Sequence, residues 1–346
     1  MWLGSVLPLL RLSGTQEEEG FPTDRPNKMK PRYRLTRAVH LCYTALALVI
    51  LFLCSCSQGG KQTSGNDSTI LVIGVMPSVD YLPIAIAEQK GFFAKPIRLV
   101  RFSSPMERDA ALQTGAVDAS VTDYMGAMLL QSKGTEVQLP IACQGAFRLV
   151  LGKKQQLNTL ADLRGGRIGL SSNTLIEYAT EHALVESGQP IPYERVEVQR
   201  IPIRLEMLRS GELDGAILPE PYASMATADG LKAIDLPSHL TSNITGLVFL
   251  SSSVKAKESA LASFLVGYDQ AVTFLNTHPR EEWISVLQDL LGITPEVARA
   301  LPLPTYTTAT QPREEDLIPI LNWMKGRELV APSYEPRGLV GLHFTD

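Results

Sequence analysis

The residues of this chain that could bind a ligand lie where predicted buried strands end and helices begin. In open α/β sheets, ligands bind beyond the carboxyl ends of the strands, next to free helix N–H groups. Acids, hydroxyls and aromatic rings occupy these positions and offer hydrogen bonds, negative charge and stacking surfaces. The candidate ligand-binding residues are Asp80, Tyr81, Asp123, Ser171, Ser172, Asn173, Thr174, Glu177, Glu220 and Tyr222.

Local structural roles are the alternative interpretation of these residues. Asp80 and Asp123 also fit helix N-caps. Thr174 and Glu177 have the spacing of a capping box, in which the carboxylate reaches back to the amide of the capping residue. Tyr81 is interpreted as a stacking platform, as is the tyrosine at 222, and core packing is the alternative for both. The sequence leaves both interpretations open.

Catalytic motifs do not accompany the candidates. The five histidines are scattered without metal-ligand spacing, and Cys143 is the one cysteine beyond residue 56. The patterns G-x-x-x-x-G-K-[ST], G-x-S-x-G and H-E-x-x-H do not occur in the sequence. We therefore expect a protein that is not an enzyme and that holds no metal and no cofactor.

Alternating strands and helices must position the candidate residues. Short apolar runs predict strands at 69–75, 97–102, 118–122, 137–142, 147–151, 167–170, 196–201, 214–218, 231–234 and 246–251. Helical patterns, many of them ended by glycine, cover 83–90, 106–114, 124–132, 160–166, 175–187, 204–210, 222–229, 255–276, 281–291 and 295–300. This alternation predicts an α/β fold of two lobes, each with a mostly parallel sheet flanked by helices. The proline-rich residues 302–336 predict an extended tail.

Composition narrows the class of partner. A chain of 346 residues that is 45% apolar and 20% charged can bury the cores of two folded units. Residues 1–55 hold seven of the 32 bases and four of the 36 acids, so 25 bases and 32 acids remain in the acidic body. Because phosphate binding needs clustered lysine and arginine, nucleic acid is excluded as a partner.

The N-terminal region, residues 1–55, is predicted to be an export signal. A basic stretch from Met29 is followed by an uncharged apolar run over 41–53 and then by small residues. About 13 apolar residues are too few to span the roughly 30 Å of bilayer hydrocarbon comfortably, and a retained anchor helix is the alternative. Acids at 17–19 precede the basic stretch, so we expect Met29 to be the true start.

The segment Leu53-Cys54-Ser55-Cys56 resembles a bacterial lipobox. The resemblance implies lipidation of Cys56, because Ser55 is the small residue before the cleavage site. Buried acyl methylenes contribute about 0.8 kcal/mol each and would anchor the protein to a membrane, with residues 56–68 as a flexible tether. With Cys56 acylated, Cys143 has no partner and no disulfide is expected.

Several segments, in order, resemble ABC-transporter solute-binding proteins of the nitrate/sulfonate/taurine and thiamine-precursor (pyrimidine) binding family. They are SVDYLPIAIAEQKGFF at 78–93, LQTGAVDA at 112–119, ADLRGGRIGL at 161–170, LRSGELDGA at 208–216 and PEPY at 219–222. The last of these matches the family's acid-proline step and suggests that Glu220 lines the cleft. The resemblance covers roughly residues 69–290.

The resemblance implies a two-lobed periplasmic-binding-protein (type II) fold that closes around a solute by hinge bending. It places lobe 1 at 69–151 and 245–346, and lobe 2 at 152–244. It further implies a monomeric lipoprotein outside the cytoplasm, periplasmic or on the outer surface, that delivers a small-molecule solute to an ABC permease and its ATPase.

Charge in the candidate loops indicates the solute. These loops hold four acids, and Arg148 is the one cation nearby. Burying carboxylates opposite an anion is costly, so an aminopyrimidine thiamine precursor is the predicted solute. The first alternative is a protein of the same fold that binds sulfonate, taurine or nitrate. The second is an enzyme that resembles thiamine-precursor synthases.

Overall fold

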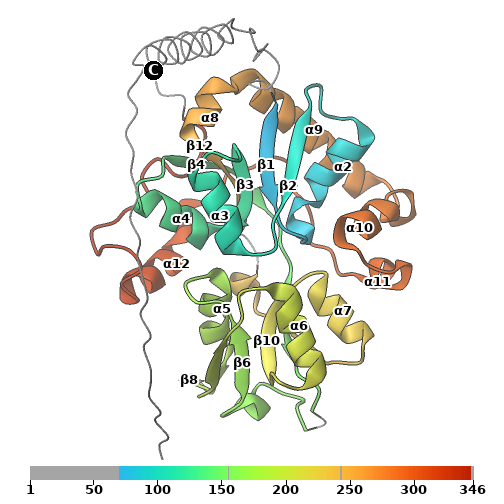
Figure 1. Ribbon diagram of the computed structural model, residues 1–346, viewed down its shortest axis with the longest axis vertical. Helices are drawn as coiled ribbons and strands as arrows, with labels where there is room; N and C mark the ends of the chain where they lie inside the picture. Colours follow the sequence, from blue (N-terminus) through green and yellow to red (C-terminus); the bar gives the residue numbers. More distant parts are fainter. Residues whose placement is uncertain (1–69, 155, 242–243, 344–346) are drawn as a thin grey trace, which may run out of the picture. The chain divides into compact units, whose positions relative to one another are not determined.

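The computed structural model describes residues 70–154, 156–241 and 244–343. The predicted signal, Cys56 and the tether lie outside these ranges. Two five-stranded sheets organise the described residues (Figure 1). Within these residues, no helix has both the length and the apolar character needed to cross a membrane.

The first sheet has the strand order β2-β1-β3-β12-β4. Its strands are β2 (Ile97–Arg101), β1 (Leu71–Val75), β3 (Ala119–Asp123), β12 (Thr245–Leu250) and β4 (Val137–Cys143). β1 is parallel to β2 and β3, whereas β12 is antiparallel to both of its neighbours. The chain therefore leaves this sheet after β4 and returns to it at β12.

Helices cover both faces of the first sheet. Alternation along β1 sends Ile73 into one core cluster and Val72 into another. The Ile73 face is covered by α2 (Leu82–Lys90), α9 (Glu258–Thr277) and α10 (Ile284–Leu291), with α8 (Ser251–Ala256) and α11 (Pro295–Ala300) beside them. The Val72 face is covered by α3 (Pro105–Gln113), α4 (Tyr124–Ser132) and α12 (Glu314–Gly326).

The second sheet has the order β11-β5-β10-β6-β9. Its strands are β11 (Ala233–Asp235), β5 (Phe147–Leu151), β10 (Gly215–Pro219), β6 (Arg167–Leu170) and β9 (Glu194–Glu197). One face packs on α5 (Leu175–Ala183), and the other packs on α6 (Ile201–Ser210) and α7 (Tyr222–Ala228). Short 3-10 helices lie at Val79–Tyr81, Ala161–Leu163, Ser238–Leu240 and Arg280–Glu282.

The predicted architecture of two mostly parallel α/β lobes is confirmed, since each sheet contains a single antiparallel strand. Strand β5 requires a correction. It pairs with β10 and β11 of the second sheet, whereas the predicted boundary placed it in the first lobe.

Two predicted boundaries in the second lobe are wrong. The helix predicted to reach residue 187 ends at Ala183, and a hairpin of β7 (Val185–Glu186) and β8 (Gln189–Pro190) follows. Ser187 and Gly188 both have positive φ, which is the geometry of a tight two-residue hairpin turn. Helix α6 begins at Ile201 instead of residue 204, because Pro202 fits the first turn of a helix.

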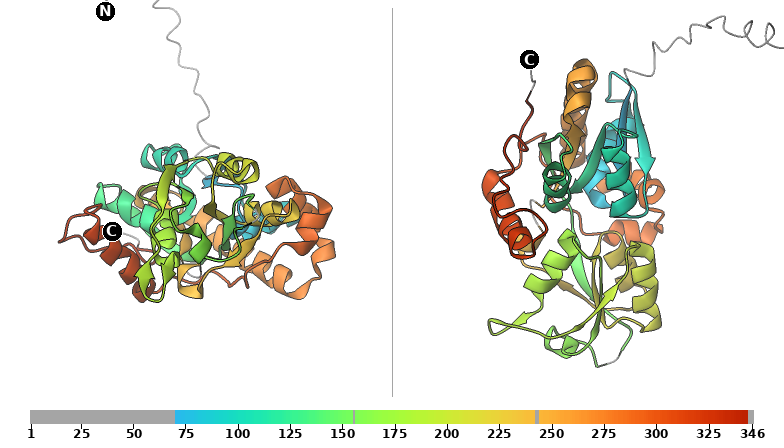
Figure 2. Two further views of the ribbon diagram at one scale, coloured as in Figure 1. Left: turned by 90° about the horizontal axis from the view of Figure 1, so that it is seen from below. Right: turned by 60° about the vertical axis from the view of Figure 1, so that its left-hand side comes forward.

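The C-terminal region is not the extended tail that its prolines predict. Helix α12 forms there and includes Pro319 in its interior. Its apolar residues at 317, 320, 321 and 324 form one buried stripe, and the helix lies beside α4 (Figures 1 and 2). After α12, Val340 bridges to Leu139, so the chain end covers the outer edge of β4.

Candidate functional site

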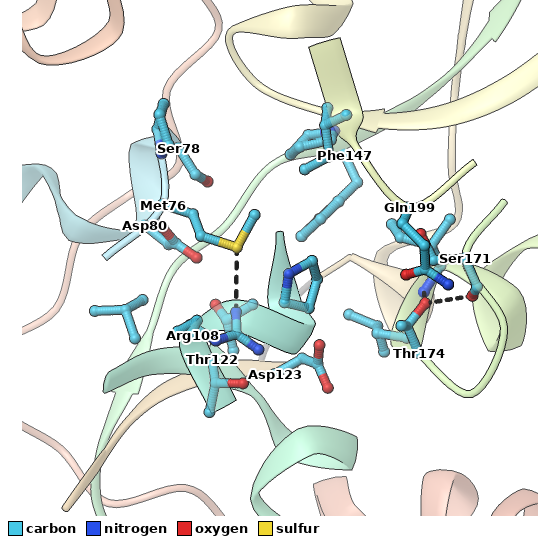
Figure 3. A pocket seen from close by; sticks show the side chains of 18 of the residues that line it. Met76, Ser78, Asp80, Arg108, Thr122, Asp123, Phe147, Ser171, Thr174 and Gln199 are labelled. Carbon is cyan, nitrogen blue, oxygen red and sulfur yellow. Dashed lines mark hydrogen bonds between the residues drawn. The ribbon is translucent and has the colours of Figure 1, made fainter. Parts of the chain in front are cut away.

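A pocket opens between the two sheets, at the carboxyl ends of strands from both (Figure 3). Its cavity measures about 70 Å³. A water molecule needs about 10 to 15 Å³ on the same measure, so the cavity holds about five to seven water-sized groups. The lining residues are Met76, Pro77, Ser78, Asp80, Pro105, Arg108, Val121, Thr122, Asp123, Phe147, Ser171, Thr174, Leu175, Ile176, Gln199, Ile201, Arg204, Pro219 and Thr245.

Two acids, the buried Asp80 and the half-buried Asp123, lie on the first-lobe side of the pocket. Asp80 follows β1, is 8% exposed, and has a pKa raised by burial to about 6. Asp123 ends β3 and caps α4, where its Oδ1 accepts a hydrogen bond from the Gly126 N–H at 2.7 Å. Burial also raises the pKa of Asp123. Asp123 therefore combines the capping role with a place in the pocket.

Arg108 lies between these acids and was not among the predicted site residues. Its side chain is buried, its Nε donates to Asp109 at 2.8 Å, and its Nη1 lies 3.5 Å from the Met76 sulfur. Its Nη2 and the neighbouring Thr122 Oγ1 have no hydrogen-bond partner among the described residues. Burial lowers the pKa of Arg108, but Asp109 and the two pocket acids have a larger effect in the opposite direction. The pKa of Arg108 is therefore above its usual value. Arg108 therefore stays charged with an unused donor beside the cavity.

Arg204, also absent from the prediction, lies on the second-lobe side and is fully buried. Its Nη2 donates to Ser171 Oγ at 2.6 Å and to the Val198 carbonyl at 2.8 Å, and its Nη1 donates to the Ile217 carbonyl at 3.2 Å. Its Nε has no partner, and the guanidinium contacts no carboxylate within the described ranges. Burial lowers its pKa to about 10, so it remains a cation at neutral pH.

These arginines correct the expectation from the sequence that the site holds acids with Arg148 as the one nearby cation. Arg148, expected to be the one nearby cation, instead pairs with Asp235 at 2.8 Å and does not line the pocket. Two carboxylates, one buried and one half-buried, and two buried guanidiniums line the cavity. An acceptor group on a solute would therefore meet cations as well as acids.

Helix starts complete the second-lobe side. The Thr174 hydroxyl caps α5 by accepting from the Ile176 N–H at 3.2 Å and donates to the Ser171 carbonyl at 2.7 Å. The first turn of α6 contributes Ile201, and Gln199 precedes it. Free N–H groups at the starts of two helices favour hydrogen-bond acceptors on a ligand.

Four of the ten predicted ligand-binding residues therefore line the pocket, namely Asp80, Asp123, Ser171 and Thr174. The other six lie outside it. Tyr81 is fully buried in the core of the first lobe. Tyr222 packs against the core of the second lobe.

The remaining four have polar partners elsewhere. Glu177 accepts from the Asn173 N–H at 2.6 Å and pairs with Arg195 at 2.5 Å. The Glu177 carboxylate thus accepts from the amide of Asn173, whereas the predicted capping box paired it with the amide of Thr174. The Ser172 hydroxyl donates to a glutamate at the end of β9. Glu220 is fully buried and accepts from the backbone N–H at position 224 in α7.

The described residues offer little for metal binding or nucleophilic chemistry. Among the described residues, no three His, Cys, Asp or Glu side chains lie close enough together to hold a metal ion. Cys143 is fully buried, and burial raises the pKa of its thiol well above the usual range. The thiol therefore stays protonated and is a poor nucleophile.

Two α/β lobes with a pocket at the carboxyl ends of their strands define the type II periplasmic-binding-protein fold. The family model described as "NMT1/THI5 like" matches residues 78–282, more than half of the chain. The chain belongs to this NMT1/THI5-like family, which confirms the resemblance seen in the sequence motifs.

Individual relatives are more distant. A Brachyspira hyodysenteriae protein, provisionally named an ABC transporter periplasmic binding protein, is 22% identical over 68% of this chain and 74% of its own. A Haemophilus influenzae protein, provisionally named a thiamine biosynthesis protein, is 24% identical over 59% and 68%. The alkanesulfonate-binding protein SsuA of Xanthomonas axonopodis superposes with a TM-score of 0.63 at 18% identity, covering 76% of this chain and 94% of its own.

Proposed function

We propose that this protein is the extracytoplasmic solute-binding component of an ABC importer. It captures a small polar solute between its two lobes and passes it unchanged to a permease and its ATPase. The pocket carries this proposal, because charged and polar residues from both lobes line one small space. Arg108, Thr122 and Arg204 each also keep one buried polar atom without a partner among the described residues. Such groups cost free energy until water or a ligand satisfies them. The printed name of the Brachyspira relative supports the same class.

Hinge bending is the proposed mechanism of capture. The chain crosses between the sheets after β4 and again before β12, so two short connections join the lobes. We propose the lobes as 69–146 with 245–346, and 147–244. A solute that contacts both lobes favours the closed form by its differential affinity for that form.

An aminopyrimidine of the thiamine-precursor type is the proposed solute. Its amino group can donate a hydrogen bond to a carboxylate, and its adjacent ring nitrogen can accept one from a guanidinium N–H or a protonated carboxyl group. Asp80 and Asp123 supply carboxylates, and Phe147 lines the cavity with an aromatic ring.

Sulfonate, taurine or nitrate is a second candidate solute, favoured by a specific observation. Arg204 is a buried cation with no carboxylate in contact within the described residues, and Arg108 has a free buried donor. Guanidinium groups bind planar and tetrahedral oxyanions well. The structural relative from Xanthomonas is an alkanesulfonate-binding protein.

A thermal-shift panel tests the proposed function and separates the two solute classes. The panel holds 4-amino-2-methylpyrimidine, methanesulfonate, taurine and nitrate. A solute at about 100 times its Kd should stabilise the protein by about 2.7 kcal/mol, and we expect the aminopyrimidine to do so. An increase in melting temperature with the anions alone would favour the second candidate solute over the aminopyrimidine. The absence of any shift across the panel would contradict both.

An enzymatic role is the remaining alternative, since one relative is provisionally named a thiamine biosynthesis protein. Incubation of the full chain with each panel solute, followed by mass spectrometry of the mixture, tests it. We expect each solute to be recovered unchanged. A new product that depends on the protein would overturn the transport proposal.

Anchoring by lipid at Cys56 completes the proposal. A monomeric lipoprotein outside the cytoplasm would hold its lobes close to the permease. Intact-protein mass spectrometry from the native host should show a chain that starts at Cys56 and carries acyl groups, and Cys56→Ser should abolish that modification. Recovery of peptides from residues 2–27 would contradict both the cleavage and the start at Met29.

A further inference from the structure

The C-terminal helix α12 is anchored to the first lobe. Its buried side chains pack in the same core cluster as α4. Polar contacts strengthen this anchor, because the Tyr334 hydroxyl donates to Gln131 Oε1 at 2.7 Å and Gln131 Nε2 donates to the Arg337 carbonyl at 3.0 Å. The segment from α12 onward therefore belongs with α4.

The end of α12 and its C-cap residue also contact the second lobe, whose helix α5 shares the same apolar cluster. Trp323 Nε1 donates to Glu181 Oε2 at 2.8 Å, and Arg327 pairs with Oε1 of the same carboxylate. The Trp323 ring also meets the Tyr178 ring edge-on, with centroids 5.8 Å apart and an interplanar angle of 83°. Tyr178 and Glu181 both belong to α5. We call these four residues the clasp.

Helix α5 connects the clasp to the pocket. Its capping residue Thr174 and its first two residues line the cavity, and the clasp holds its other half. A rigid helix transmits a constraint at one end to the other end. The clasp therefore fixes the position of the first turn of α5 relative to Asp80 and Arg108, which lie across the cavity.

We propose that the clasp is a positioning device that holds the two lobes closed and slows solute release. This proposal rests on the proposed function, because it assigns a role in solute retention to residues that do not touch the solute. Opening the cleft moves α5 away from α12, and Glu181 then keeps Arg195, at 3.5 Å, as its one cationic partner among the described residues. Hydrogen bonds to a charged acceptor are stronger than neutral ones, so their loss favours the open form.

Lobe separation in the absence of solute provides the test, so that its outcome does not depend on which solute is correct. Spin labels attached through p-azidophenylalanine at Val266 in α9 and Val185 in β7 report the distance between lobes in the full chain. Both positions are exposed, at 58% and 37%. The test variants are Trp323→Phe, which keeps an aromatic ring but removes the N–H, and Glu181→Gln.

The matched control is Lys325→Gln, because Lys325 lies on the same helix but pairs with Glu335 instead of α5. We expect both clasp variants to raise the open-to-closed ratio about 3- to 10-fold and the control to leave it unchanged. The effects of the two substitutions should be less than additive in the double variant, because Trp323 donates to the same carboxylate that Glu181→Gln removes. Melting temperatures, measured in parallel, verify that each variant is folded.

Solute release supplies a second measurement, with 4-amino-2-methylpyrimidine as the probe. The clasp variants should raise its dissociation rate by a similar factor with little change in association rate. Unchanged distance distributions in folded Trp323→Phe and Glu181→Gln would overturn the clasp and leave the proposed function intact. Failure of the probe to bind the unmodified protein would instead count against the proposed aminopyrimidine solute.

Discussion

Replacement of Asp80 by asparagine should stabilise the protein without solute while it weakens solute binding. Burial raises the Asp80 pKa from 3.8 to about 6. That difference corresponds to about 3 kcal/mol, which is the cost of keeping this carboxylate charged in the folded state at neutral pH. Because the folded state holds the proton more tightly than the unfolded state, stability falls as the pH rises from about 4 to 6.

The assay is urea unfolding of the protein without solute at pH 4 and pH 7.5. Asp80→Asn should exceed the parent protein in stability by up to about 3 kcal/mol at pH 7.5 and differ little at pH 4. Asp162→Asn is a control of opposite sign. Backbone N–H groups of Asn158 and Thr159 lower the Asp162 pKa, so its carboxylate stabilises the fold above about pH 4 and loses that effect as the pH falls.

Two results would refute this reasoning. If Asp80→Asn were less stable than the parent at pH 7.5, the buried carboxylate would be a net stabilising group. If the stability difference did not change with pH, the ionisation of Asp80 would not be its source. A stabilised variant that still binds solute with full affinity would remove Asp80 from the binding site.

Three further predictions test the pocket and the packing around it. Arg204→Met should cost about 3 to 5 kcal/mol in urea unfolding, because it leaves three buried acceptors without their donor, and lysine should recover part of the loss. Phe147→Ala should cost about 1 kcal/mol of calorimetric affinity for 4-amino-2-methylpyrimidine and less for nitrate, because the ring offers stacking. Gly152→Ala would place a Cβ 1.9 Å from the Leu213 carbonyl oxygen and should cost about 3 kcal/mol, whereas Gly326→Ala meets no atom within 4 Å and should stabilise α12 by up to about 1 kcal/mol.

Most of the fold could be predicted because its signals are local. Short apolar strands bounded by glycine specify their own type, and α4 and β6 have the predicted bounds. The signal failed where long-range packing outweighs local preference. Pro319 disfavours a helix in isolation, yet α12 forms because its apolar stripe is buried against α4.

The site was predictable only in part, and the reason is geometric. Residues at strand ends, such as Asp80 and Asp123, follow directly from the topology rule for open sheets. The two arginines lie elsewhere. Arg108 is the fourth residue of α3, and Arg204 is the fourth residue of α6. Side chains in a helix lean toward its N-terminus, so a long side chain one turn into the helix still reaches the pocket. Extending the search to the first turn of the helix that follows each strand finds both arginines.

The corresponding positions of these arginines bear on both solute chemistries that we propose. In the first lobe, Arg108 lies among acids, so that side of the cavity can accept hydrogen bonds from a solute. In the second lobe, Arg204 has no acid in contact among the described residues, so that side presents a cation beside the hydroxyl of Thr174 and the amide of Gln199. A solute must satisfy both sides to recover the cost of burying them. Aminopyrimidines and aminosulfonates both carry donors and acceptors, whereas nitrate carries acceptors alone and would leave Asp80 unpaired. The division of charge between the lobes therefore favours solutes with both kinds of group.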